Sequence, residues 1–153
     1  MSRREQIKMS EAEVAGFLGE ERTVTCATIG PRGWPHLMPL WYVVRDGECW
    51  AWTYAKSQKV RNLEHDRRAT LQIESGDTYD QLRGVMIQAA TEIHRDTGTV
   101  AALGFELAER YARGSLSDDA AEAIRRQAAK RVALRFAARR TASWDHRKLG
   151  GAY

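Results

Sequence analysis

The stretch Thr53-Tyr54-Ala55-Lys56-Ser57-Gln58-Lys59-Val60-Arg61-Asn62-Leu63 carries the information that decides the fold. Its first residues end an aromatic segment, Glu48–Tyr54, which is typical of a strand. Ser57 is a good N-cap, and apolar residues follow at helical spacing, which predicts a short helix over Ser57–His65. A strand that leads directly into a helix indicates a domain of mixed α and β structure.

The start of this helix is basic, whereas the first turn of a helix usually carries Asp or Glu. The positive end of the helix dipole carries three cations, Lys56, Lys59 and Arg61. A bound phosphate would turn this repulsion into attraction, because the free N–H groups and the cations would then face one anion. The pattern predicts a phosphate site, and the alternative is an exposed basic helix start without a function.

The chain on either side of this stretch predicts five more strands. An Asp46-Gly47 pair indicates a hairpin that leads into Glu48–Tyr54, and the alternation of the last strand slips at Ala137-Ala138. The five additional strands are Thr23–Ile29, His36–Val44, Ala69–Glu74, Gly84–Arg95 and Arg131–Thr141.

Helices are predicted before the first strand and before the last. Ser10 and Glu13 form a capping box, and Ala-rich segments predict helices over Thr97–Arg113 and Ser117–Lys130. The fold class is therefore α+β, with six strands in an antiparallel, barrel-like sheet, because a small sheet must hide its edges. A length of 153 residues without repeats or linkers predicts one domain over 1–153.

The composition argues against several classes of protein. The longest apolar run, Leu37–Val44, is far shorter than the ~20 residues of a membrane span, and no apolar stretch follows the N-terminus. We therefore expect a cytoplasmic protein without a membrane partner, in which Cys26 and Cys49 are reduced core thiols. Acidic and basic residues are mixed along the chain, which argues against a nucleic-acid partner. The four histidines lack metal-ligand spacing, so no metal site is predicted.

Aromatic residues are concentrated on the strands that precede the basic helix. Trp50, Trp52 and Tyr54 share one strand face by the period-two rule. They could wall a planar heterocycle, or fill a barrel core or a dimer interface, and the second interpretation is favoured for most of them. No nucleophile and base pair is recognisable, so no catalytic residue is assigned, and a cofactor would supply the chemistry.

These segments resemble the pyridoxamine phosphate oxidase-like split β-barrel superfamily. The resemblance is carried by the turn Gly30–Pro35, the strand segment Pro39–Tyr42 and the stretch Lys56–Ala69. The tail Ser143–Gly151 is similar to that of the flavin/deazaflavin oxidoreductase B group, whose members use the deazaflavin coenzyme F420.

The resemblance implies a six-stranded split β-barrel with flanking helices, and a homodimer with two cofactor clefts at the subunit interface. It also assigns residues to three parts of each cleft. These are Lys56, Ser57, Lys59 and Asn62 with Arg61 as a helper at the phosphate, Pro39, Leu40, Trp41 and Thr53 along the ring system and ribityl chain, and Trp144 as a closing residue, supplied by the partner.

The function that the resemblance implies is an F420-dependent reductase, which transfers a hydride from reduced deazaflavin to an unsaturated small molecule. Two alternatives remain open. One is an FMN-binding oxidoreductase of the same fold, and the other is a non-catalytic F420-binding or carrier protein.

Overall fold

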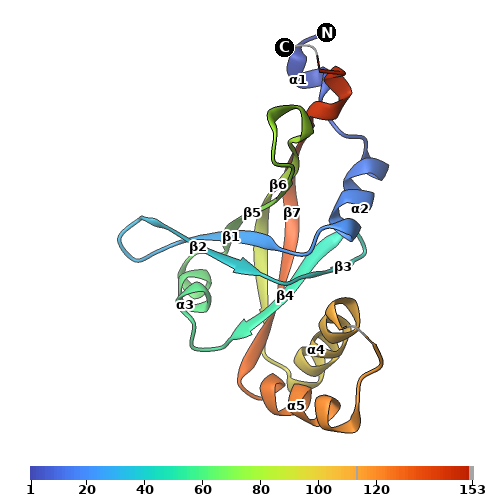
Figure 1. Ribbon diagram of the computed structural model, residues 1–153. Coiled ribbons are helices and arrows are strands. Elements are labelled where there is room, and N and C mark those ends of the chain that lie inside the picture. Colours follow the sequence, from blue (N-terminus) through green and yellow to red (C-terminus); the bar gives the residue numbers. More distant parts are fainter. Residues whose placement is uncertain (113, 152–153) are drawn as a thin grey trace.

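The computed structural model describes residues 1–112 and 114–151. Within these residues, seven antiparallel strands form one sheet in the order β2-β1-β5-β6-β7-β4-β3. The sheet coils strongly, so that β1 and β2 run across β6 and β7 (Figure 1). The strands are β1 (Val24–Ile29), β2 (Pro35–Leu40), β3 (Val43–Arg45), β4 (Glu48–Tyr54), β5 (Arg68–Ser75), β6 (Arg83–His94) and β7 (Arg131–Asp145).

The predicted count of six strands is wrong, because the predicted strand His36–Val44 is divided into β2 and β3. β2 pairs with β1 at one edge of the sheet, whereas β3 pairs with β4 at the other. Between the two strands Tyr42 is fully buried, and its hydroxyl donates to the carbonyl oxygen of Leu18 at 2.7 Å. Buried Tyr42 thus fixes the segment that connects β2 at one edge of the sheet to β3 at the other. The continuous apolar run in the sequence does not show that the strand is divided here.

The hairpin predicted at Asp46-Gly47 is confirmed. Both residues have positive φ, 50° and 78°, as a type I′ turn requires. Arg45 then lies opposite Glu48, and β4 has the predicted bounds. The turn therefore sets the register of β3 and β4, and with it which residues of β4 share a face.

Five α-helices flank the sheet in the described part of the chain. The capping box is confirmed, because the Glu13 carboxylate accepts from Ser10 N at 2.6 Å. Residue 113, to which the sequence extends the fourth helix, lies outside the described residues. The helices are α1 (Arg3–Gln6), α2 (Glu11–Glu20), α3 (Gln58–His65), α4 (Thr97–Tyr111) and α5 (Asp118–Ala128), with 3-10 turns η1 (Tyr79–Gln81) and η2 (His146–Leu149).

The last strand is longer than predicted and contains a bulge. β7 ends at Asp145 rather than Thr141, because it pairs with β6 over nearly the whole length of both strands. The register shifts between Gln88 and Ala89 of β6, which leaves Arg139 as the extra residue of β7. The predicted slip in alternation lies directly beside this bulge.

Two apolar clusters hold the elements together. The larger fills the inside of the coiled sheet, with residues from β1, β4, β5, β6 and β7 and from helices α2 and α3. The smaller lies between α4 and the outer side of β4 and β7. The edge strands β2 and β3 are not paired with each other in the described residues, so the barrel is open between them.

Candidate functional site

The first turn of α3 is fixed by its cap and by its packing. The Ser57 hydroxyl accepts a hydrogen bond from Val60 N at 3.4 Å, which confirms Ser57 as the N-cap, and the helix begins at Gln58. Val60 and Leu63 are fully buried in the larger core cluster. These contacts determine which polar residues of α3 face the sheet and which face outward.

Lys59 is a buried cation on this helix. It is 4% exposed, and its Nζ donates to Thr53 Oγ1 at 3.3 Å. Burial lowers the pKa of Lys59, although its interaction with Cys26 opposes part of that shift. Burial also raises the pKa of the Cys26 thiol to about 12, so the thiol is neutral near pH 7. A buried ammonium with a neutral acceptor is unfavourable, and an anion bound beside it would offset the desolvation.

The buried charge predicts a pH-dependent stability that Lys59→Met removes. The folded-state pKa of Lys59 lies below the ordinary value of 10.5, so the unfolded chain binds more protons between the two values. The free energy of unfolding of the wild type should therefore rise with pH across this window. In Lys59→Met this contribution to the rise should be absent. Urea unfolding at a series of pH values measures the difference, with exposed Lys8→Met as the control. Parallel pH profiles for the wild type and Lys59→Met would contradict the assignment.

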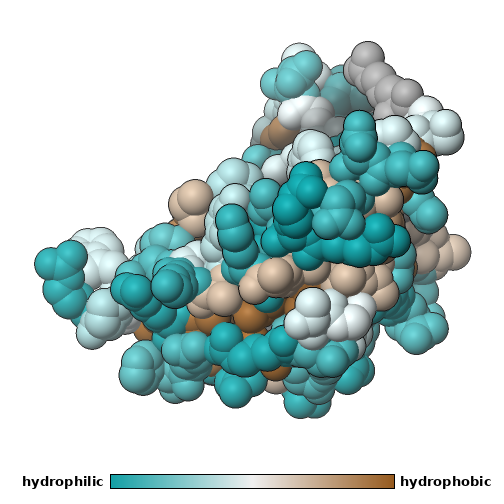
Figure 2. Space-filling model, turned by 90° about the horizontal axis from the view of Figure 1, so that it is seen from below, coloured by the Kyte–Doolittle hydropathy of each residue, from teal (hydrophilic) through white to brown (hydrophobic). Residues whose placement is uncertain are grey.

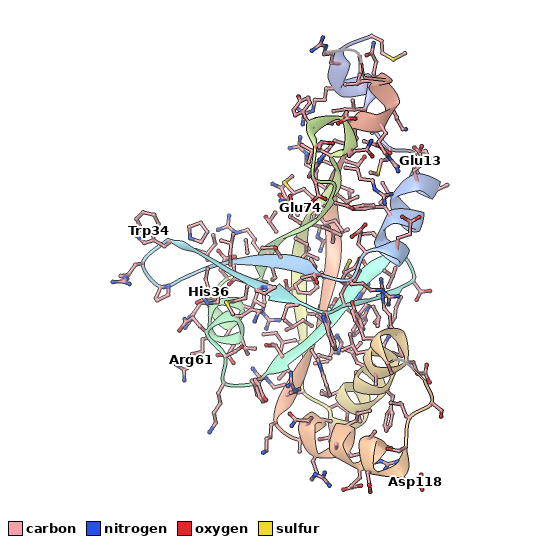
Figure 3. All side chains as sticks on the ribbon, in the orientation of Figure 1. Glu13, Trp34, His36, Arg61, Glu74 and Asp118 are labelled. Carbon is pink, nitrogen blue, oxygen red and sulfur yellow. The ribbon has the colours of Figure 1, made fainter. Side chains whose placement is uncertain are left out.

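A series of side-chain hydrogen bonds connects α3 to β1. Gln58 Nε2 donates to Asn62 Oδ1 at 2.8 Å, and Asn62 Nδ2 donates to Thr28 Oγ1 at 3.0 Å. His36 lies opposite Thr28 in the register of β1 and β2, on the side of α3 (Figure 3). Its Nδ1 is buried and has no hydrogen-bond partner among the described residues. The sequence did not single out His36, because strand register alone places it here.

A hollow of about 670 Å³ lies beside this series of hydrogen bonds. Arg61 is exposed there, on the outer side of α3, and points away from the sheet (Figure 3). Lys56 precedes the helix and is also exposed. The residues that line the hollow are Ile29, Gly30, Pro31, Gln58, Arg61, Asn62, His65 and Asp66.

A second pocket, of about 400 Å³, lies between the end of β2, the outer side of β4 and helices α4 and α5. Three of the residues that the resemblance assigned to the cofactor, Pro39, Leu40 and Trp41, line it together with Trp52 and Arg131. Seen from below, apolar surface occupies the middle of this end of the molecule, with hydrophilic residues around it (Figure 2). The assigned residues are thus divided between α3 and this pocket.

The large aromatic residues of β4 do not fill the barrel core. Alternation along the strand turns Cys49 and Thr53 inward and the rings outward. Trp50 stacks on His94 with ring centroids 5.3 Å apart, and both Trp50 and Trp52 pack against the smaller cluster. The packing of α4 against this side of β4 and β7 covers the outward-facing rings, so contacts between distant segments decide the orientation.

Trp144 is paired with Gly84 near the C-terminal end of β7. This end of the strand is remote from α3 (Figure 1). Trp144 packs against Gly84 of β6, and it lines a separate hollow with Arg83. Within one chain, the structure therefore brings together residues of α3 and Thr53, but not Trp144. Closure of the cleft by this residue would require a partner subunit.

The described residues contain no group of three or more His, Cys, Asp or Glu side chains that could hold a metal ion. His94 and Glu92 share a strand face, with His94 Nε2 3.3 Å from Glu92 Oε2, and Arg135 also contacts Glu92 at 3.2 Å. No helix in the described ranges is long and apolar enough to cross a membrane.

The sequence that forms this sheet and its helices matches a known family. The model of the pyridoxamine 5′-phosphate oxidase family matches residues 10–145, and this chain belongs to that family. No curated protein sequence matches the chain.

Solved structures extend the comparison. The conserved hypothetical protein Rv2991 from Mycobacterium tuberculosis is 47% identical, with a TM-score of 0.90 over 100% of this chain and 95% of that one. An F420 reductase is 21% identical, with a TM-score of 0.66 over 83% of this chain and 94% of that one. The heme storage protein HutZ from Vibrio cholerae is 15% identical, with a TM-score of 0.67 over 88% and 93%. The last two are similar in fold alone.

Proposed function

We propose that this protein is a coenzyme F420-dependent oxidoreductase, which transfers a hydride from reduced deazaflavin to an unsaturated small molecule. The observation that carries the proposal is the buried ammonium of Lys59, hydrogen-bonded to Thr53 at the start of α3 in a chain of this family. An F420 reductase of similar fold supports the choice of cofactor. An FMN-binding oxidoreductase and a non-catalytic F420 carrier are the alternatives.

The groups at α3 have the chemistry that a phosphate requires. Lys59, Lys56 and Arg61 are cations, and the first turn of the helix adds N–H donors at the positive end of its dipole. The nearby carboxylate of Asp66 is paired with Arg68 at 2.6 Å, which holds the pKa of Asp66 at about 2. Repulsion of an anion by Asp66 is therefore reduced by its own partner.

In this proposal the residues of the chain bind and orient, and the bound deazaflavin supplies the hydride. Lys59 and Asn62 bind the phosphate, and Thr53 orients the Lys59 ammonium through its hydroxyl. Pro39, Leu40 and Trp41 flank the ring system, as the resemblance implies, and exclude water from the reacting face.

The proposal includes a homodimer in which Trp144 of the partner subunit closes each cleft. Its support is the apolar surface of the edge strand β2 and the turn before it. Leu37 is 57% exposed, Met38 is 45% exposed and Trp34 is 76% exposed. An apolar edge strand of this kind is typical of an interaction surface.

Equilibrium binding to F420 and to FMN, side by side, tests the cofactor assignment. The protein is freed of bound cofactor, and quenching of its tryptophan fluorescence is followed during each titration. We expect tight binding of F420 and weak binding of FMN. A preference for FMN would favour the alternative of an FMN-binding oxidoreductase. If the protein bound neither cofactor, the proposed phosphate site at α3 would be overturned.

Turnover separates the reductase from the carrier. Reduced F420 is mixed with the protein and a panel of quinones, enones and tetrapyrroles, and its reoxidation is recorded. We expect enzyme-dependent reoxidation with at least one compound. Tight binding of F420 without reoxidation across the panel would favour the carrier.

A further inference from the structure

Arg131, at the start of β7, stands in the pocket between β4, α4 and α5 without an acidic partner. Its guanidinium lies over two rings of β4, 4.7 Å from the Trp52 centroid and 4.1 Å from the Tyr54 centroid. Its Nε donates to Gln127 Oε1 at 3.4 Å, and no carboxylate in the part of the chain that the structure describes pairs with it. Stacking occupies the faces of a guanidinium and leaves the N–H groups at its edge available for a planar anion.

One wall of this pocket is held rigid by a second ring. Trp41 stacks on Tyr111 with ring centroids 4.3 Å apart and planes inclined by 7°. The Tyr111 hydroxyl accepts from Tyr42 N at 3.1 Å and is also 2.6 Å from the carbonyl oxygen of Arg22. These bonds fix the Tyr111 ring, and Tyr111 in turn orients the exposed Trp41 indole along the pocket.

Trp52 also lines this pocket, and its indole lies against a glycine of α4. A Cβ at Gly104 would lie 2.5 Å from Trp52 Cζ3 and 3.0 Å from Ile124 Cγ2. Glycine inside a helix is less favourable than alanine, so its presence here is explained by the close approach of the indole. Both indoles of the pocket are therefore preorganised rather than free to collapse into it.

We propose that this pocket binds an organic carboxylate with a flat, apolar body. Arg131 pairs with the carboxylate through two parallel hydrogen bonds, while the indoles of Trp41 and Trp52 contact the body. Arg131 is the one charged residue in the lining that the structure describes, which suits a single negative charge rather than a phosphate. A volume of about 400 Å³ accommodates a small ring system.

The role of this ligand as the substrate rests on the proposed function, because Pro39, Leu40 and Trp41 would also flank the cofactor ring. The binding itself does not depend on the cofactor. A deazaflavin held along these residues would supply the hydride, and Arg131 would orient an unsaturated carboxylate in this pocket. The substrates of this protein would then be unsaturated or aromatic carboxylates.

Binding of 2-naphthoate and of 2-naphthamide to the cofactor-free protein tests the pocket. The two probes have the same flat body and differ in charge, and the tryptophan fluorescence of the protein, to which Trp41 and Trp52 contribute, reports on the binding of both. We expect naphthoate to bind at least about tenfold more tightly than the amide. Arg131→Gln should remove this difference without changing the affinity for the amide. Equal affinities of the wild type for the two probes would overturn the proposal.

Two further variants guard against indirect effects. Ala108→Phe fills the pocket from α4 and should abolish binding of both probes, whereas the exposed Arg126→Gln on α5 should change neither. Melting curves establish that each variant is folded. If Ala108→Phe bound naphthoate as the wild type does, the ligand would lie elsewhere and the proposal would be wrong.

The same variants separate this inference from the proposed function. Lys59→Met should lose F420 affinity and keep naphthoate affinity, and Arg131→Gln should show the reverse pattern. If the protein bound naphthoate in preference to the amide but bound neither F420 nor FMN, the carboxylate pocket would be supported and the cofactor assignment would be overturned. If the protein bound F420 but showed no Arg131-dependent preference for naphthoate, the cofactor assignment would be supported and the carboxylate pocket would be overturned.

Discussion

Lys59→Met should weaken F420 binding by about 10- to 100-fold while the protein remains folded. Methionine keeps most of the buried stem of Lys59 and removes the ammonium that donates to Thr53 Oγ1. A hydrogen bond to a charged group contributes about 1.5–3 kcal/mol, and each 1.4 kcal/mol corresponds to about a factor of ten in affinity. Tryptophan fluorescence titration of both proteins with F420 measures the change directly.

Lys8→Met is the matched control for this prediction. Lys8 is exposed, and it lies between α1 and α2, far along the chain from α3. Its replacement removes the same charge from the protein, so a general electrostatic effect would appear in both variants. Equal F420 affinity for the wild type and Lys59→Met would show that the buried ammonium does not bind the phosphate. A similar loss in both variants would assign the effect to net charge.

Gly84→Ala should destabilise the protein by about 1–3 kcal/mol. Gly84 is buried in β6, where a Cβ would overlap Trp144 Cζ2 and lie 2.9 Å from the carbonyl oxygen of Ile73 in β5. The indole is large and the carbonyl belongs to the sheet, so neither can yield without distorting the pairing of β5, β6 and β7. Thermal unfolding should record a fall of about 2–4 °C for each kcal/mol.

Gly16→Ala is the control, because it makes the same chemical change at an open position. A Cβ at Gly16 meets nothing within 4 Å, and the residue lies inside α2. This variant should be stabilised by about 0.5–1 kcal/mol, since alanine favours a helix. Adding Trp144→Leu to Gly84→Ala should recover part of the lost stability. An unchanged melting temperature for Gly84→Ala would contradict the close packing of Trp144 on this strand.

The local structure predicted around the candidate site is confirmed where it depended on neighbours in sequence. The cap at Ser57 and the burial of Val60 and Leu63 follow from local spacing, and they place Lys59 and Asn62 toward the sheet. His36 and Arg131 were not recognised as site residues. Strand pairing positions both residues, because His36 lies opposite Thr28 of β1 and Arg131 lies opposite Tyr54 of β4.

The sequence by itself determined the elements whose signals are local. The capping box at Ser10, the type I′ hairpin at Asp46-Gly47, the helix at Ser57 and the α+β class all depend on residues within a few positions of one another. The resemblance of the segment Lys56–Ala69 to a family belongs to the same kind of information, and the family assignment agrees with it.

Only the tertiary structure decided how distant segments meet. It divided the run His36–Val44 between two edges of the sheet, turned the indoles of β4 outward, and separated Trp144 from α3 within one chain. Each of these outcomes depends on strand register and on the curvature of the sheet. Register and curvature arise from contacts between residues tens of positions apart, and no short pattern in the sequence records them.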